Sequence, residues 1–205
     1  MEQEKKKRPF ITAKEAFVAI VVIYLTAIAF NKPVPFIDML VPPAPERKVS
    51  EQEIINFSPQ IKDISAQQIA DNINSNGKPT LMVLYTSWCG YCKILMPNIS
   101  TLKKEGKIEG INLLLISVDK ERNKASKYKL EHNYDKVFTP YIMASEDEED
   151  LKNIIKNKNG NYTRAIPYAL FFDSHGNLLE ETIGIINKKM LLSKLENAIN
   201  NPKLR

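Results

Sequence analysis

An α/β fold, in which helices flank a mixed β-sheet, is predicted by three features of the sequence. Apolar runs of strand length alternate with helical patterns along residues 58–203. Two of these runs, residues 80–86 and 111–118, are continuous, as is typical of strands buried on both faces of a sheet. The last two runs flank the turn sequence Ser-His-Gly-Asn and indicate an antiparallel hairpin. Strand–helix alternation that ends in a hairpin predicts a mixed sheet with helices on both faces.

Local signals place the elements in order. Ser145 and Glu148 have the spacing of a capping box, so a helix is expected to start there. The acidic residues that follow suit a helix N-terminus better than a metal site. The expected elements are a weak strand at 60–64, helix 65–75, strand 80–86, helix 89–105, strand 111–118, helix 121–132, the hairpin 168–173 and 178–184, and helix 187–200.

The N-terminal region predicts a link to a membrane. A basic tail, residues 1–9, precedes residues 10–30, in which fifteen consecutive uncharged positions begin at Ala16. We expect an uncleaved transmembrane anchor with a cytoplasmic N-terminus, because the positive charges precede the apolar run. The protein would then be a single-pass inner-membrane protein with a periplasmic domain. The alternative is a signal peptide cleaved after Ala27-Ile28-Ala29, which would leave a soluble periplasmic protein.

Composition separates a linker from the folded domain. Residues 31–59 contain six of the twelve prolines and no glycine, so residues 31–57 are expected to form a stiff, extended linker. All seven glycines lie between Gly77 and Gly184, within the domain expected at residues 58–203. The net charge is +5, but residues 50–205 hold 21 basic against 19 acidic side chains. Nucleic-acid binding is therefore not expected.

Cys89-Gly90-Tyr91-Cys92 lies where a buried strand leads into a helix. A thiol at a helix N-terminus has a lowered pKa, because unpaired N–H groups and the helix dipole stabilise its thiolate. Cys89 is therefore expected to be the exposed nucleophile. Cys92, one turn inward, would attack the resulting mixed disulfide.

Other roles for the two cysteines fit the sequence less well. A structural zinc site needs four ligands, and the chain has no further cysteine; His132 and His175 lack ligand spacing. Covalent haem attachment needs a histidine at position 93, where Lys93 stands. A purely structural disulfide would close a loop too short to add much stability. No metal and no cofactor other than the Cys89–Cys92 pair are expected.

The segment Trp88 to Lys93, with Pro97 eight positions after Cys89, resembles the active-site helix of thioredoxins. Ala165-Ile166-Pro167-Tyr168 resembles the cis-proline segment of the same superfamily. The resemblance covers about residues 58–203 and implies the thioredoxin fold. The extra residues around 133–162 resemble the inserted element of membrane-anchored, TlpA-like and cytochrome-c-maturation thioredoxins.

The resemblance also implies roles for individual residues. Cys89 and Cys92 would be catalytic, and Trp88, Gly90 and Tyr91 would modulate the active site. Ile166 and Pro167 would bind the substrate, with the Ile166–Pro167 bond in the cis form.

The sequence departs from the thioredoxin pattern in its interior. Val83 and Leu115 occupy the positions of thioredoxin's buried aspartate and lysine, so both members of that pair are missing. Losing both leaves an apolar core, whereas losing one would leave a buried charge without a partner. The proton acceptor for Cys92 is thus not identified by the sequence.

These features predict an extracytoplasmic thiol-disulfide oxidoreductase. We expect it to reduce disulfides in protein substrates with electrons from a membrane donor of the thiol-transporter type, since Gly90-Tyr91 lacks the histidine found in strong oxidants of the superfamily. A disulfide oxidase or isomerase is the enzymatic alternative. A non-catalytic metal-delivery or binding module of the same fold is a third.

Overall fold

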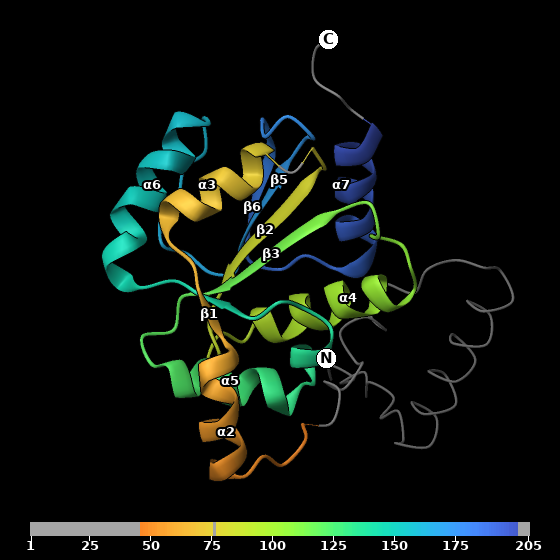
Figure 1. Ribbon diagram of the computed structural model, residues 1–205. Coiled ribbons are helices and arrows are strands. Elements are labelled where there is room, and N and C mark those ends of the chain that lie inside the picture. The colour runs from red at the N-terminus through yellow and green to blue at the C-terminus, as the bar shows by residue number, and fades with distance from the viewer. Residues whose placement is uncertain (1–45, 76, 201–205) are drawn as a thin grey trace, which may run out of the picture. The chain divides into compact units, whose positions relative to one another are not determined.

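The structure, a computed structural model, describes residues 46–75 and 77–200. Its centre is a six-stranded sheet in the order β1-β4-β3-β2-β5-β6 (Figure 1). The first four strands in this order are parallel to one another, whereas β5 and β6 pair antiparallel. The predicted mixed sheet is confirmed. The strands are β1 (Lys62–Asp63), β2 (Thr80–Tyr85), β3 (Asn112–Ser117), β4 (Tyr141–Ile142), β5 (Tyr168–Phe172) and β6 (Leu178–Ile183).

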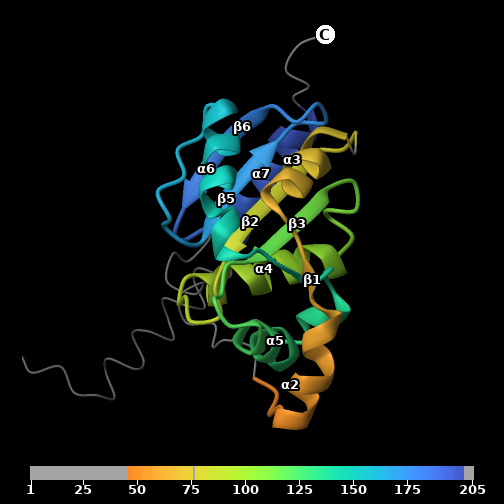
Figure 2. The same ribbon diagram turned by 60° about the vertical axis from the view of Figure 1, so that its left-hand side comes forward.

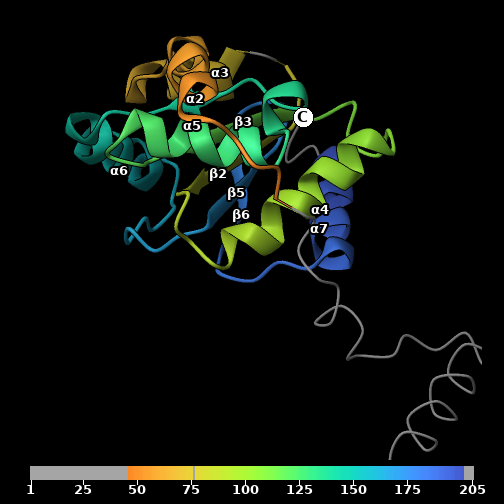
Figure 3. The same cartoon turned by 90° about the horizontal axis from the view of Figure 1, so that it is seen from below.

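Helices cover both faces of this sheet. In Figure 2, α3 and α6 lie together on one face, and Figure 3 shows α4 beside α7. The helices are α2 (Glu51–Phe57), α3 (Ala66–Ser75), α4 (Cys92–Lys104), α5 (Arg122–Glu131), α6 (Glu148–Asn157) and α7 (Lys188–Asn200). Short 3₁₀ turns occupy Ser58–Gln60, Tyr134–Lys136 and Ser145–Asp147.

The continuous apolar run of β2 contributes side chains to the hydrophobic cores on both faces of the sheet. Successive side chains of a strand point to opposite faces, so Leu81, Val83 and Tyr85 enter the core beneath α4 and α7. Met82 and Leu84 enter the core beneath α3 and α6. All six residues of β2 are buried, as expected for a strand covered on both faces.

Helix α2 corrects the expected linker boundary. Residues 51–57 are helical rather than extended, and Ser50 and Glu53 form a capping box at the N-terminus. Phe57 at the helix end is buried in a cluster with Ala125 and Leu130 of α5. This apolar contact explains why the segment folds in spite of the surrounding prolines.

Two further expectations need correction. Helix α4 begins at Cys92 rather than Cys89, because the three residues before it form a turn. At α6, Ser145 provides no side-chain cap; a 3₁₀ turn occupies Ser145–Asp147 and the helix starts only at Glu148. The segment expected as an insertion contains β4 and α6.

The anchor predicted at residues 10–30 lies outside the described residues, as does most of the linker. Within the part of the chain that the structure describes, no helix has the length and apolar character needed to cross a membrane.

Candidate active site

The site forms where β2 ends and α4 begins. Cys89 and Cys92 are joined in a disulfide whose Cα atoms lie 5.2 Å apart. The backbone N–H of Cys92, the first residue of α4, donates a hydrogen bond to Cys89 Sγ at 3.2 Å. A helix N-terminus thus points at the first sulfur, which favours a thiolate there once the disulfide opens.

The two cysteines differ in burial, although less than expected. Cys92 is fully buried, and Cys89 is 5% exposed. The expectation of an exposed Cys89 is wrong for the disulfide form, because its sulfur turns toward Cys92 and the apolar cluster that both residues join. The predicted order holds, since Cys89 is the more accessible of the two.

Exposed residues surround the disulfide. Trp88 is 72% exposed and Tyr91 52% exposed, on either side of the exposed Gly90. A Cβ at Gly90 would meet nothing within 4 Å, so the surface in front of the disulfide is open. An approaching polypeptide would meet these exposed residues, and of the two cysteines only Cys89 has any exposed surface.

The cis-proline segment lies at the same site. The Ile166–Pro167 bond is cis, which confirms that prediction. Ile166 packs against the apolar cluster that contains both cysteines. The N–H of Gly184, a residue with a φ of 86°, donates to Pro167 O at 3.1 Å and fixes the loop from the far side. The structure thus brings Ile166 of the predicted substrate-binding pair to the apolar cluster that holds both cysteines and to a cavity that Trp88 also lines.

An open cavity of about 530 Å³ lies beside Trp88, the residue before Cys89, although neither cysteine lines it. Trp88 and Ile166 line it together with Met143, which belongs to the inserted segment. The charged residues that line it are Asp63, Asp119, Lys120, Arg122, Glu146, Glu148 and Arg164. The cavity is large enough to hold side chains of a polypeptide beside Trp88 and Ile166.

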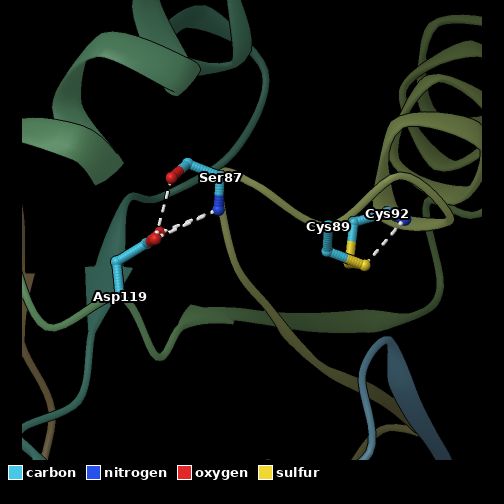
Figure 4. The surroundings of a disulfide bond; sticks show 4 residues. All are labelled: Ser87, Cys89, Cys92 and Asp119. Carbon is cyan, nitrogen blue, oxygen red and sulfur yellow. Dashed lines mark hydrogen bonds between the residues drawn. A yellow bond between two sulfur atoms is a disulfide. The ribbon is translucent and has the colours of Figure 1, made fainter.

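Sequence reasoning missed Asp119 and Ser87. Figure 4 shows that Asp119, after the end of β3, accepts hydrogen bonds from the loop that carries Cys89. Its oxygens accept from the Ser87 N–H at 2.9 Å and the Ser87 hydroxyl at 2.8 Å. The Ser117 hydroxyl donates to the same carboxylate at 2.8 Å. The sequence signal that could have found this pair is a polar residue shortly after each of two neighbouring buried strands, Ser87 after β2 and Asp119 after β3.

The interior beneath the disulfide is apolar at the positions that the sequence singled out. Val83 and Leu115 face each other directly in the register of β2 and β3 and are both buried. The buried cation of this region comes from another element. Lys129 of α5 is 3% exposed, and burial lowers its pKa to about 7.

Clusters of metal-ligating side chains are expected neither at the cysteines nor at the histidines. Among residues 46–75 and 77–200, no group of three or more histidine, cysteine, aspartate or glutamate side chains is placed to hold a metal ion. His132 and His175 lie on different segments: one caps α5, and the other lies in the turn between β5 and β6.

Comparison with known families decides the assignment. The family model for the thioredoxin-like domain matches residues 66–199. The chain belongs to the thioredoxin-like family. The match includes the Cys89–Cys92 disulfide, the cis Ile166–Pro167 segment and every strand of the sheet except β1.

Curated relatives carry thioredoxin-like names. The chain is 27% identical over 117 residues to the chloroplastic thioredoxin-like protein HCF164 of Oryza sativa subsp. japonica, covering 56% of this chain and 39% of that protein. It is 31% identical over 84 residues to a thioredoxin-like protein of Haemophilus influenzae, covering 41% and 44%. The chain therefore spans less than half the length of these curated relatives.

The comparison with solved structures gives matches at low identity. A thiol:disulfide interchange protein of the thioredoxin family from Chlorobium tepidum superposes with a TM-score of 0.49 at 19% identity. That superposition covers 60% of this chain and 81% of the other.

Proposed function

We propose that this thioredoxin-like chain is a thiol-disulfide oxidoreductase that reduces disulfides in protein substrates. The observation that carries the proposal is a disulfide at the N-terminus of α4, with exposed Trp88 and Tyr91 beside its cysteines in the chain and Ile166 of the cis-proline segment packed against the same apolar cluster. A disulfide that served only stability would not need an open approach or a helix N-terminus aimed at one sulfur.

The reaction proceeds by two exchanges. In the reduced protein, the Cys89 thiolate attacks one sulfur of a substrate disulfide, forms a mixed disulfide and expels the first substrate thiolate. The Cys92 thiolate then attacks Cys89 Sγ, forms the Cys89–Cys92 bond and expels the second substrate thiolate. Two electrons pass from the protein to the substrate, and the two expelled thiolates take protons from water.

The residues between the cysteines favour the reducing direction of the reaction. Gly90 and Tyr91 carry no positive charge that would stabilise the Cys89 thiolate and so favour the reduced form. A pair without that stabilisation is the better electron donor. An external reductase needs electrons supplied across the membrane, so a membrane dithiol donor is the expected partner.

Trapping tests the chemistry directly. Reduced Cys92→Ser should form a stable mixed disulfide with insulin, visible on a non-reducing gel, because the resolving thiol is gone. Reduced Cys89→Ser should form much less, since Cys92 is fully buried. Faster alkylation of Cys92 than of Cys89 at neutral pH would contradict the assignment of roles.

We further propose that residues 10–30 anchor the chain with the domain outside the cytoplasm. The support is the excess of positive charge before the apolar run and the short, nearly uncharged segment after it. Alkaline phosphatase fused after residue 50 should be active, because that reporter folds only outside the cytoplasm. An inactive fusion contradicts the orientation. A mature protein that starts at Phe30 would keep the compartment and replace the anchor by a cleaved signal.

A further inference from the structure

Lys129 is a buried cation that the exchange steps above do not use. It is the one buried lysine or arginine among residues 46–75 and 77–200. Its Nζ donates a hydrogen bond to Tyr141 O at 3.2 Å and lies 5.8 Å from the centre of the Tyr85 ring. No carboxylate of the described residues lies within 4.0 Å of it. A lysine buried without an ion-pair partner is costly, which calls for an explanation.

The position of Lys129 relates it to the cysteines. Lys129 lines a small cavity of about 10 Å³ together with Met96 and Leu115. Met96 follows Cys92 by one helical turn on the same face of α4, which places the cavity about one turn, roughly 6 Å of helix rise, from Cys92. Cys92, Met96 and Leu115 belong to one apolar cluster. Charges interact over several ångströms in such surroundings far more strongly than in water.

Lys129 is about half protonated at pH 7, because its pKa is about 7, and the other groups that face it do not neutralise this charge. Tyr85 of β2 and Tyr134 of the 3₁₀ turn are neutral at pH 7, as phenols ordinarily are, and burial raises the pKa of both further. Asp119 attracts the ammonium and raises its pKa, but burial outweighs this effect and the pKa falls to about 7. The Asp119 carboxylate already accepts bonds from the serines at positions 87 and 117. Lys103 of α4 is exposed. Its Nζ lies 5.7 Å from the centre of the Phe138 ring, and Phe138 lines the same cavity as Lys129.

We propose that the Lys129 ammonium stabilises the thiolate of Cys92 when the disulfide is open, and so sets how readily Cys92 resolves the mixed disulfide. This proposal rests on the proposed function and deepens it. The Cys92 thiol loses its proton to water, and the thiolate attacks Cys89 Sγ and expels the substrate sulfur with its bonding electron pair. Lys129 supplies charge and exchanges no electrons; it is a positioning residue. The coupling is reciprocal, so the thiolate also keeps Lys129 protonated.

Titration of Cys92 tests the proposal. In the full chain carrying Cys89→Ser, Cys92 is the sole thiol, and the ultraviolet absorbance of its thiolate gives its pKa directly. Adding Lys129→Met should raise the pKa of Cys92 by about 0.3 unit, roughly a twofold change in the acid constant, because Lys129 is only partly charged where a thiol titrates. Lys129→Gln, which keeps a donor for Tyr141 O but carries no charge, should raise it equally. Lys127→Met on the exposed side of α5 is the matched control and should leave it unchanged.

The two neutral variants separate the charge of Lys129 from its hydrogen bond. The proposal is overturned if Lys129→Met and Lys129→Gln both keep the parental pKa of Cys92. It is also overturned if Lys129→Met raises that pKa and Lys129→Gln does not, because the hydrogen bond rather than the charge would then be responsible. Urea unfolding of each variant shows that it is folded at the pH of the titration.

The same experiment separates this proposal from the proposed function, since the titration needs no substrate. A shifted Cys92 pKa without insulin reduction by the parent chain would uphold the charge effect of Lys129 and contradict the reductase. Insulin reduction by the parent chain, with the pKa of Cys92 unchanged in the Lys129 variants, would support the reductase and contradict the charge effect of Lys129.

Discussion

Asp119 links the end of β3 to the loop that carries Cys89. Its carboxylate accepts the N–H and the hydroxyl of Ser87, two residues before Cys89, and is itself 5% exposed. Hydrogen bonds to a buried charged group contribute more to stability than those between neutral groups. The carboxylate therefore holds the loop that carries Cys89 against the segment that follows β3.

Asp119→Asn should lower the free energy of unfolding by about 2 kcal/mol. The Ser87 N–H and the hydroxyls of Ser87 and Ser117 would lose a charged acceptor. Urea unfolding of the oxidised protein measures this. Ser87→Ala should cost about 1 kcal/mol, since the backbone N–H keeps its partner. Glu109→Gln, at an exposed loop position, is the matched control and should change little. Equal stability of Asp119→Asn and the parent would show that the loop is held by other contacts.

Lys129 should also make stability depend on pH. Its pKa in the folded protein is about 7, below the ordinary value of 10.5. Between these two values the unfolded chain binds a proton that the folded protein does not, so stability rises with pH from about 7 upward. Between pH 7 and 9 the gain in unfolding free energy should be about 2 kcal/mol for the oxidised parent relative to Lys129→Met. Parallel curves for the two proteins would contradict the lowered pKa.

Helix α2 packs against the rest of the domain through one apolar side, which contacts α5. Phe57 is 7% exposed in the cluster formed with α5, whereas Ile55 on the same helix is 51% exposed. Helices this short are not stable alone, so packing must hold α2 in place. Ser50 and Glu53 close its N-terminus with a reciprocal capping box.

Phe57→Ala should therefore lower the free energy of unfolding by about 3 kcal/mol, through lost burial and the cavity that remains. Ile55→Ala on the same helix should change it by less than about 0.5 kcal/mol, because the side chain already faces water. Urea unfolding monitored by circular dichroism compares the two. Similar small effects would mean that α2 does not contribute to the folded unit.

Over the whole molecule, the parts that could be predicted from the sequence are those with a local signal. β2 and β3 are continuous apolar runs, and the helix N-terminus at the cysteines follows from the strand before it. The capping box at Ser50 is visible in the sequence, but the surrounding prolines favour a linker. β4 has two residues, too few to show a period.

The parts that escaped prediction depend on contacts between distant segments. Ser87 and Asp119 are 32 positions apart, and only the parallel pairing of β2 and β3 brings them together. Lys129 lies in a helix rich in charged residues, where a lysine is ordinarily exposed. Its burial depends on Tyr134 and Phe138, which follow α5 in the chain and line the same small cavity.

Cys89 and Cys92 are proposed to form a redox pair that donates electrons to protein disulfides. The reduction potential of this pair, measured in the full chain by equilibration with glutathione, tests this proposal most directly. We predict a value near that of thioredoxin, about −270 mV. A value near about −120 mV would indicate an oxidant, and one well below about −300 mV a structural disulfide; either result would contradict the account.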